Sequence, residues 1–176
     1  MKKLATLTFA SLATVAFAGQ PVVTTVDKGY KPIVTEPCFA EQELQLDLFG
    51  AFIETEGDSH DGGWGGGIGI NYYFSRHIGI GVDYTIVDGD GEELHLVNGH
   101  LLARWPIDLG DLCLAPYLKA GGGWQVNGAS DANWGGCGGI EFRLNPEFGI
   151  FAEGGYYWSA DDDNYIAARA GIRFIF

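Results

Sequence analysis

The chain has 176 residues, a formal net charge of −13 at pH 7, 47% hydrophobic residues and 28 glycines. This length suits a single domain. The acidic balance excludes a nucleic-acid partner, because binding to phosphates requires a basic surface.

The first element in the chain is a predicted export signal. Lys2 and Lys3 precede an apolar run that ends at Phe17, and residues 16–18 have the small-x-small pattern of a cleavage site. The run of roughly 14 apolar residues is shorter than the ~20 that a membrane-spanning helix needs. We therefore predict a signal peptide over residues 1–18, cleaved after Ala18, and an N-terminal periplasmic segment over residues 19–40.

The rest of the chain, residues 41–176, alternates between apolar and polar residues with the period of two that is typical of β-strands. Turn-like or acidic stretches separate the alternating segments, whose lengths suit tilted strands that cross a bilayer. The segments span residues 43–53, 64–74, 77–87, 94–105, 114–126, 134–144, 148–158 and 165–176. This pattern predicts an all-β fold, an eight-stranded antiparallel up-and-down transmembrane β-barrel.

Charged residues within these segments share one face of each strand, and the opposite face is apolar, aromatic or glycine. The segments with two charges test this assignment, and in each of them both charges lie on the same face. The predicted inward set has as many acids as bases: Glu43, Asp47, Asp83, Arg104, Lys119, Glu141, Arg143, Glu153, Arg169 and Arg173. Because side chains fill the interior of an eight-stranded barrel, its charges must be paired. We therefore predict a network of ion pairs that plugs the lumen.

Tryptophans and connections indicate how the barrel is oriented. Every tryptophan falls on the outward parity near a segment end, as in the aromatic girdles of membrane barrels: Trp64, Trp105, Trp124, Trp134 and Trp158. Short connections at 75–76, 106–112 and 145–147 alternate with acidic ones at 55–63, 88–93, 127–132 and 159–164. An even strand number puts both termini in the periplasm, so the acidic connections are expected to face outside.

The last segment shows the two faces most clearly. Every second residue from Ile166 to Phe176 is apolar, and Arg169 and Arg173 lie on the other parity. We expect this strand to close the barrel against residues 43–53. Its arginines are expected to find partners in a set of four inward acids: Glu141, Glu153, Asp47 and Glu43.

Several short motifs carry a resemblance to a known family. They are Tyr72 to Val82 (YYFSRHIGIGV), Arg104-Trp105-Pro106, Ala115 to Trp124 (APYLKAGGGW) and the terminal Phe176. In this order they resemble the small outer-membrane β-barrel family, which includes the transmembrane domain of OmpA-like proteins and porin-like surface proteins. The resemblance covers residues 41–176.

That resemblance has implications for assembly and location. It implies that Phe176, with Phe174 and Ile172 before it, is the signal read by the outer-membrane assembly machinery. It further implies a monomer in the outer membrane with a plugged lumen, in contact with outer-membrane lipids and lipopolysaccharide. No peptidoglycan-binding domain follows the barrel pattern, so cell-wall tethering is not expected.

The cysteines suggest one cross-link. Export places Cys38, Cys113 and Cys137 in an oxidising compartment, where disulfides persist. Cys38 precedes the first strand and Cys113 opens the fifth predicted strand, so both should lie at the periplasmic end. A bridge between them would pin the N-terminal segment across the barrel mouth, whereas the alternative is three free thiols. Cys137 is expected in the lumen, buried and inert.

Other candidate chemistry is weak. Asp88 to Glu92 (DGDGE) begins like a calcium loop but lacks the required glycine and the later glutamate. The histidines, His60, His77, His95 and His100, lack the spacing of metal ligands. Ser59 and His60, beside Asp58 or Asp61, lie in a loop without an oxyanion scaffold. We predict no cofactor, no metal site and no enzyme activity.

The predicted function is therefore a structural or surface-interface role in the outer membrane. The first alternative is a narrow channel, with the inward arginines and Lys119 lining a path. The second alternative is a secreted soluble barrel that binds an apolar ligand, which would require apolar residues inside and polar residues outside.

Overall fold

The computed structural model describes residues 38–56, 62–89, 92–109, 112–127, 129–160 and 164–176. The predicted signal peptide, 1–18, and most of the predicted N-terminal segment, 19–40, lie outside these ranges. No helix among the described residues is long and apolar enough to cross a membrane.

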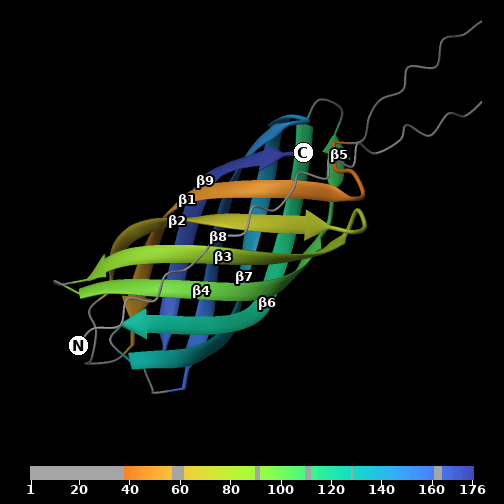
Figure 1. Ribbon diagram of the computed structural model, residues 1–176. Helices are drawn as coiled ribbons and strands as arrows, with labels where there is room; N and C mark the ends of the chain where they lie inside the picture. The colour runs from red at the N-terminus through yellow and green to blue at the C-terminus, as the bar shows by residue number, and fades with distance from the viewer. Residues whose placement is uncertain (1–37, 57–61, 90–91, 110–111, 128, 161–163) are drawn as a thin grey trace, which may run out of the picture. The chain divides into compact units, whose positions relative to one another are not determined.

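The described chain forms one sheet of antiparallel strands (Figure 1). The strands are β1 (Glu43–Thr55), β2 (Gly63–Tyr73), β3 (Ile78–Gly89), β4 (Glu92–Arg104), β5 (Ile107–Leu109), β6 (Leu112–Asn127), β7 (Ala129–Asn145), β8 (Phe148–Ser159) and β9 (Tyr165–Ile175). Each of the eight predicted segments corresponds to a long strand, β1–β4 and β6–β9, so the predicted barrel fold is confirmed.

Two pairings close the sheet into a barrel. β1 pairs with β9 from Gln45↔Ile175 to Thr55↔Tyr165, as expected for the last segment. β4 pairs with β6 from His95↔Val126 to Arg104↔Tyr117, so neither edge of the eight long strands is left open. Closure satisfies the backbone hydrogen bonds that an open edge would expose, which is the condition for a sheet in lipid.

The structure corrects two connections. The stretch 106–112 was expected to be a turn, but Ile107–Leu109 forms the short strand β5 against the start of β6. Three residues are too few to display a period, so the sequence pattern could not reveal it. The stretch 127–132 was expected to be a loop, but the β6–β7 ladder continues to Asn127↔Ala129. Asp131 therefore lies in β7, because backbone pairing continues through small polar residues.

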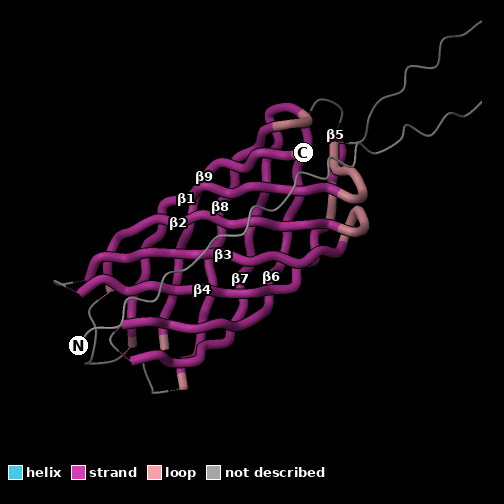
Figure 2. Tube along the Cα trace, in the orientation of Figure 1, coloured by secondary structure: helices cyan, strands magenta, loops and turns pink. Residues whose placement is uncertain are grey.

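The two ends of the barrel differ. We call one the terminus end: there Leu44 and Phe176 exchange backbone hydrogen bonds, Arg104 N donates to His77 O, and Ile175 N donates to Glu147 O. We call the opposite end, where β1 leads to β2 and β3 to β4, the loop end. Figure 2 shows strands along almost the whole described trace, with short turns at the ends.

Burial separates the two faces of the wall as the alternation predicts. Inward positions are buried, whereas outward ones expose large apolar side chains, such as Ile80, Leu101 and Leu118, at half or more of their surface. The tryptophans on the outward parity are all exposed, from Trp158 at 47% to Trp64 at 75%. Charges inside and apolar groups outside are the reverse of a soluble barrel.

Candidate functional site

The inner face of the wall carries the charged residues that the sequence analysis singled out. Each of the ten is buried, with at most 7% of its surface exposed. They come from seven of the eight long strands, so strand pairing in the barrel wall fixes their positions along the barrel axis.

The first layer of charge lies at the terminus end and is built around Glu43. Arg104 Nη1 donates to Glu43 Oε1 at 2.6 Å, and Arg143 Nη1 donates to Glu43 Oε2 at 2.9 Å. Arg143 Nε also donates to Glu141 Oε1 at 2.7 Å. The Glu43 carboxylate is thus shared by two guanidinium groups. Glu141 connects this layer to the next, because it pairs with a cation in each.

The second layer is centred on Arg173, whose side chain has no exposed surface. Its Nε and Nη2 donate to the two oxygens of Asp47 at 2.6 and 2.7 Å, in a bidentate pair. Nη1 donates to Glu141 Oε2 at 2.6 Å, and Asn71 Nδ2 donates to Asp47 Oδ2 at 2.8 Å. Bidentate pairs of this kind are geometrically specific as well as strong.

The third layer lies nearer the loop end. Lys119 Nζ is 2.8 Å from Glu153 Oε2, and Arg169 Nη1 is 3.1 Å from Asp83 Oδ1 and 3.6 Å from Glu153 Oε1. His100 Nδ1 is 3.3 Å from Asp83 Oδ2. The sequence analysis expected the arginines of the last strand to use other acids, so Asp83 is an additional partner. Which acid faces Arg169 depends on the curvature of the closed barrel, which alternation alone does not reveal.

Glycine makes room for some of these side chains. Gly139 is paired with Tyr117, whose hydroxyl donates to Glu153 Oε2 at 2.7 Å. A Cβ on Gly139 would lie 2.5 Å from Tyr117 Cζ and 2.6 Å from its hydroxyl oxygen. The absence of a side chain there therefore lets the ring of Tyr117 lie over β7 and reach Glu153 on β8.

The loop-end half of the lumen contains an apolar cluster, which the sequence analysis missed, beside buried polar side chains such as Thr85, Gln125 and Asn133. Ile53, Val87, Leu94, Leu96, Tyr157, Tyr165 and Ala167 form a buried cluster. The rings of Tyr157 and Tyr165 stack within it, with centroids 5.0 Å apart. The signal was present, since apolar residues occupy inward positions near the loop end of β1, β3, β4 and β9. Ion pairs therefore gather toward the terminus end of the lumen, and the apolar cluster lies toward the loop end.

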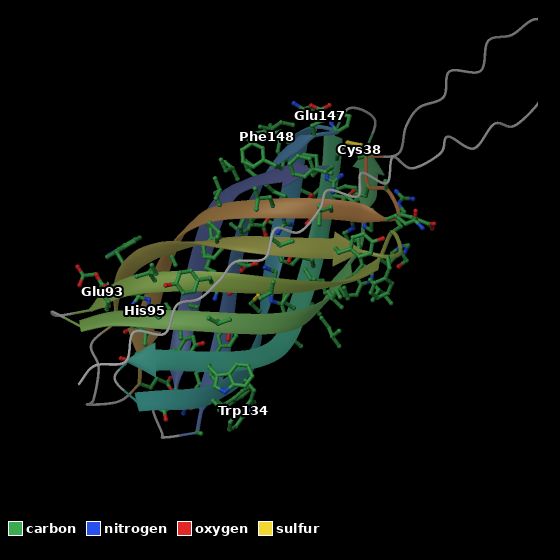
Figure 3. The ribbon with its side chains drawn as sticks, viewed as in Figure 1. Cys38, Glu93, His95, Trp134, Glu147 and Phe148 are labelled. Carbon is green, nitrogen blue, oxygen red and sulfur yellow. A yellow bond between two sulfur atoms is a disulfide. The ribbon has the colours of Figure 1, made fainter. Side chains whose placement is uncertain are left out.

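A short segment, residues 38–42, covers the terminus end, and we call it the strap. A disulfide joins Cys38 to Cys113, with Cα atoms 5.8 Å apart. Figure 3 places Cys38 at the same end as Glu147 and Phe148, away from Glu93, His95 and Trp134. Phe39 is fully buried, its ring centroid 4.1 Å from Arg143 Cζ and 5.1 Å from Arg104 Cζ.

Main-chain groups of the strap complete this arrangement. Arg104 Nη2 donates to Ala40 O at 3.0 Å, and Arg143 Nη1 donates to Cys38 O. Ala40 N donates to Glu43 Oε2 at 3.2 Å. Gln42 has a positive φ of 56°, which turns the chain from the strap into β1. The strap is thus bound by the same residues that form the first charge layer.

The remaining candidate residues have simpler surroundings. Cys137 is the free thiol of the described chain and is buried in the lumen. Among the described residues no group of three His, Cys, Asp or Glu side chains could hold a metal ion. Asp58, Ser59, His60 and Asp61 lie outside the described ranges. Directly after β9, Phe176 is 73% exposed, and Phe174 within β9 packs against Phe148 with ring centroids 5.6 Å apart. Ile172 lies on the same parity, partly exposed.

One polar trio lies on the outer wall at the loop end. Tyr84 OH is 2.8 Å from His95 Nδ1, and His95 Nε2 is 3.6 Å from Glu93 Oε2. The trio is partly to largely exposed. It was not singled out from the sequence, because the contact joins residues on adjacent strands.

This geometry defines the class: a closed eight-stranded antiparallel barrel with an apolar outer wall and buried charges on its inner face, as in small outer-membrane barrels. Solved structures of that class match it. The N-terminal β-barrel domain of Pseudomonas aeruginosa OprF has a TM-score of 0.60 at 17% identity, covering 77% of this chain and 98% of that one. Neisserial surface protein A has a TM-score of 0.60 at 16% identity, covering 75% and 95%.

A third structure, Ail, the attachment invasion locus protein of Yersinia pestis, has a TM-score of 0.53 at 18% identity, covering 77% of this chain and 99% of that one. No protein-family model matches the chain, and the comparison with curated proteins finds no match. These likenesses establish the fold.

Proposed function

We propose that this protein is an integral outer-membrane barrel with a structural or surface-interface role, whose lumen is plugged by ion pairs. The observation that carries the proposal is the inside-out wall, in which ten paired charges lie inside and a band of exposed aliphatic and aromatic residues lies outside. A lipid-facing barrel requires such a band and tolerates charge in its interior.

The filled lumen favours the plugged barrel over the narrow channel. The side chains of Arg173 and Glu141 have no exposed surface. The apolar cluster lies in the lumen between the charge layers and the loop end. A conducting path would need continuous water along the axis. Single-channel recording in planar bilayers tests this point: we expect no steady conductance, and a steady conductance would refute the plug.

Partners and location belong to the same proposal. The exposed apolar band is suited to outer-membrane lipids, and the tryptophans near strand ends are suited to the headgroup regions. The acidic connections would face outward beside lipopolysaccharide, and β9 would supply the assembly signal through Ile172, Phe174 and Phe176. The cleaved signal peptide and a monomeric state complete the proposal. No nucleic acid and no catalytic reaction are part of it.

Cell fractionation combined with a heat-dependent gel shift tests the membrane assignment. We expect the protein in the outer-membrane fraction, resistant to urea extraction, with faster migration in unboiled samples because the barrel stays folded in detergent. Release from isolated membranes by urea alone would contradict the proposal.

A further inference from the structure

The strap closes the terminus end by contacts that centre on three residues. Phe39 contacts both Arg104 and Arg143 with its ring, and carbonyl groups of the strap accept hydrogen bonds from both guanidinium groups. Glu43 accepts a hydrogen bond from Ala40 N and ion pairs with both arginines. The first charge layer is therefore shielded from solvent by the strap as well as by the barrel wall.

The disulfide holds the strap without contributing to barrel closure. Cys38 precedes β1 by five residues, and Cys113 lies at the start of β6. The pairings that close the barrel, β1 with β9 and β4 with β6, begin at Gln45 and at Arg104↔Tyr117, and include neither cysteine. Breaking the sulfur–sulfur bond would therefore remove the covalent tether of the strap and leave every strand pairing that closes the barrel in place.

The two bridged cysteines are less buried than the third cysteine. Both cysteines are partly exposed, in contrast to the buried Cys137. Thiol–disulfide exchange requires access of an attacking thiolate to one of the two sulfurs. A bond that joined two strands inside the lumen would lack this access.

We propose that Cys38–Cys113 is a reversible redox site that latches the strap over the terminus end of the lumen. A thiolate of a dithiol reductant attacks one sulfur, forms a mixed disulfide and releases the other cysteine, which takes up a proton. The second thiol of the reductant then attacks the mixed disulfide, releases the remaining cysteine and leaves as a cyclic disulfide. The dithiol thus gives up two electrons and two protons, and the protein gains two thiols.

Release of the strap changes the mouth but does not open a pore. Departure of Phe39 gives solvent access to Glu43, Arg104 and Arg143. Arg173 and its carboxylate partners remain buried in the second layer, which contacts none of the strap residues in the bonds described above. The reduced protein has a blind, charged pocket at this end, and the oxidised protein has a covered one.

Hydrogen-exchange mass spectrometry on the full-length protein in detergent tests the latch. We compare the oxidised protein with protein reduced by dithiothreitol, and verify the thiol state by alkylation. Exchange of the strap amides, residues 38–42, should rise at least tenfold on reduction, with exchange in β2, β3, β8 and β9 unchanged. The double variant C38S/C113S should show the fast exchange without reductant and no response to it.

A matched control separates this site from the third cysteine. Cys137→Ser keeps the strap disulfide and should retain the full response to dithiothreitol. An unchanged strap after complete reduction would overturn the proposal, because the non-covalent contacts would then suffice. Increased exchange across all strands would overturn it too, because the bond would then be a staple of the whole barrel. A disulfide that dithiothreitol does not reduce in the folded protein would also refute it. None of these readouts depends on the cellular location of the barrel.

Discussion

At the scale of single residues, the lumen is held together by charges that share partners. Glu43, Glu141 and Glu153 each contact two cationic side chains, and Arg143, Arg169 and Arg173 each contact two acids. A buried ion pair is weak evidence for stability, but removal of one partner leaves an uncompensated buried charge. The network therefore makes each charge dependent on the others.

Arg173 offers the sharpest test of this dependence. Arg173→Met should lower the free energy of unfolding by about 3–5 kcal/mol, because Asp47 and Glu141 lose their shared cation in a buried setting. Arg173→Lys keeps the charge but cannot form the bidentate pair, so it should recover part of the loss. Urea unfolding in lipid vesicles measures both variants. Equal stability of wild type and Arg173→Met would contradict the network.

Some glycines lie so close to a neighbouring strand that a side chain would not fit, whereas others have free space. This difference allows a second test, of whether close strand approach limits folding. A Cβ on Gly123 would lie 2.7 Å from Asn98 Cα and still closer to Val97 O, on the strand that closes the barrel. A Cβ on the outward Gly154 would have Ala167 O at 3.8 Å as its nearest neighbour. We expect Gly123→Ala to reduce the yield of folded barrel severalfold in refolding assays, and Gly154→Ala to refold like wild type. Similar yields for both would show that the β4–β6 approach is not limiting.

At the scale of strands, the period of two was sufficient to locate every long strand and its inward face. It was insufficient for β5, whose three residues show no period, and for the β6–β7 hairpin, where polar residues such as Asp131 continue a ladder. The individual ion pairs could not be predicted either. Arg169 meets Asp83 across the lumen, and such contacts depend on curvature and register rather than on parity.

The last strand carries a prediction about assembly. Phe176 is 73% exposed and, beyond its backbone bonds with Leu44, its side chain contributes little to packing. Phe176→Ser should therefore reduce the amount of folded barrel in outer membranes of cells several-fold, while the purified variant refolds in detergent with unchanged unfolding midpoint. Leu144→Ser, exposed at 56% near the same end, is the matched control and should assemble normally. Normal assembly of Phe176→Ser would exclude the terminal residue as a signal.

At the scale of the whole molecule, residue types differ between the two ends of the barrel and between the two faces of its wall. Ion pairs lie toward the terminus end, and an apolar cluster with several buried polar neighbours lies toward the loop end. Across the wall, the charged inner face is opposed by an outer face of Ile, Leu, Val, Tyr and Trp. Among the described residues, five buried acids of the inner face meet five buried bases, so these ten charges balance each other.

The outer face yields the prediction that decides between lipid and water as its environment. Val82 is exposed at 49% in the middle of β3, whereas Trp64 is exposed at 75% at the loop end of β2. In a bilayer an outward arginine costs about 2–4 kcal/mol at the midplane and about 0–1 kcal/mol near the interface. Val82→Arg should therefore destabilise the barrel in lipid vesicles much more than Trp64→Arg, as measured by urea titration. In water both arginines would be solvated, so small and equal effects would show that this wall does not face lipid.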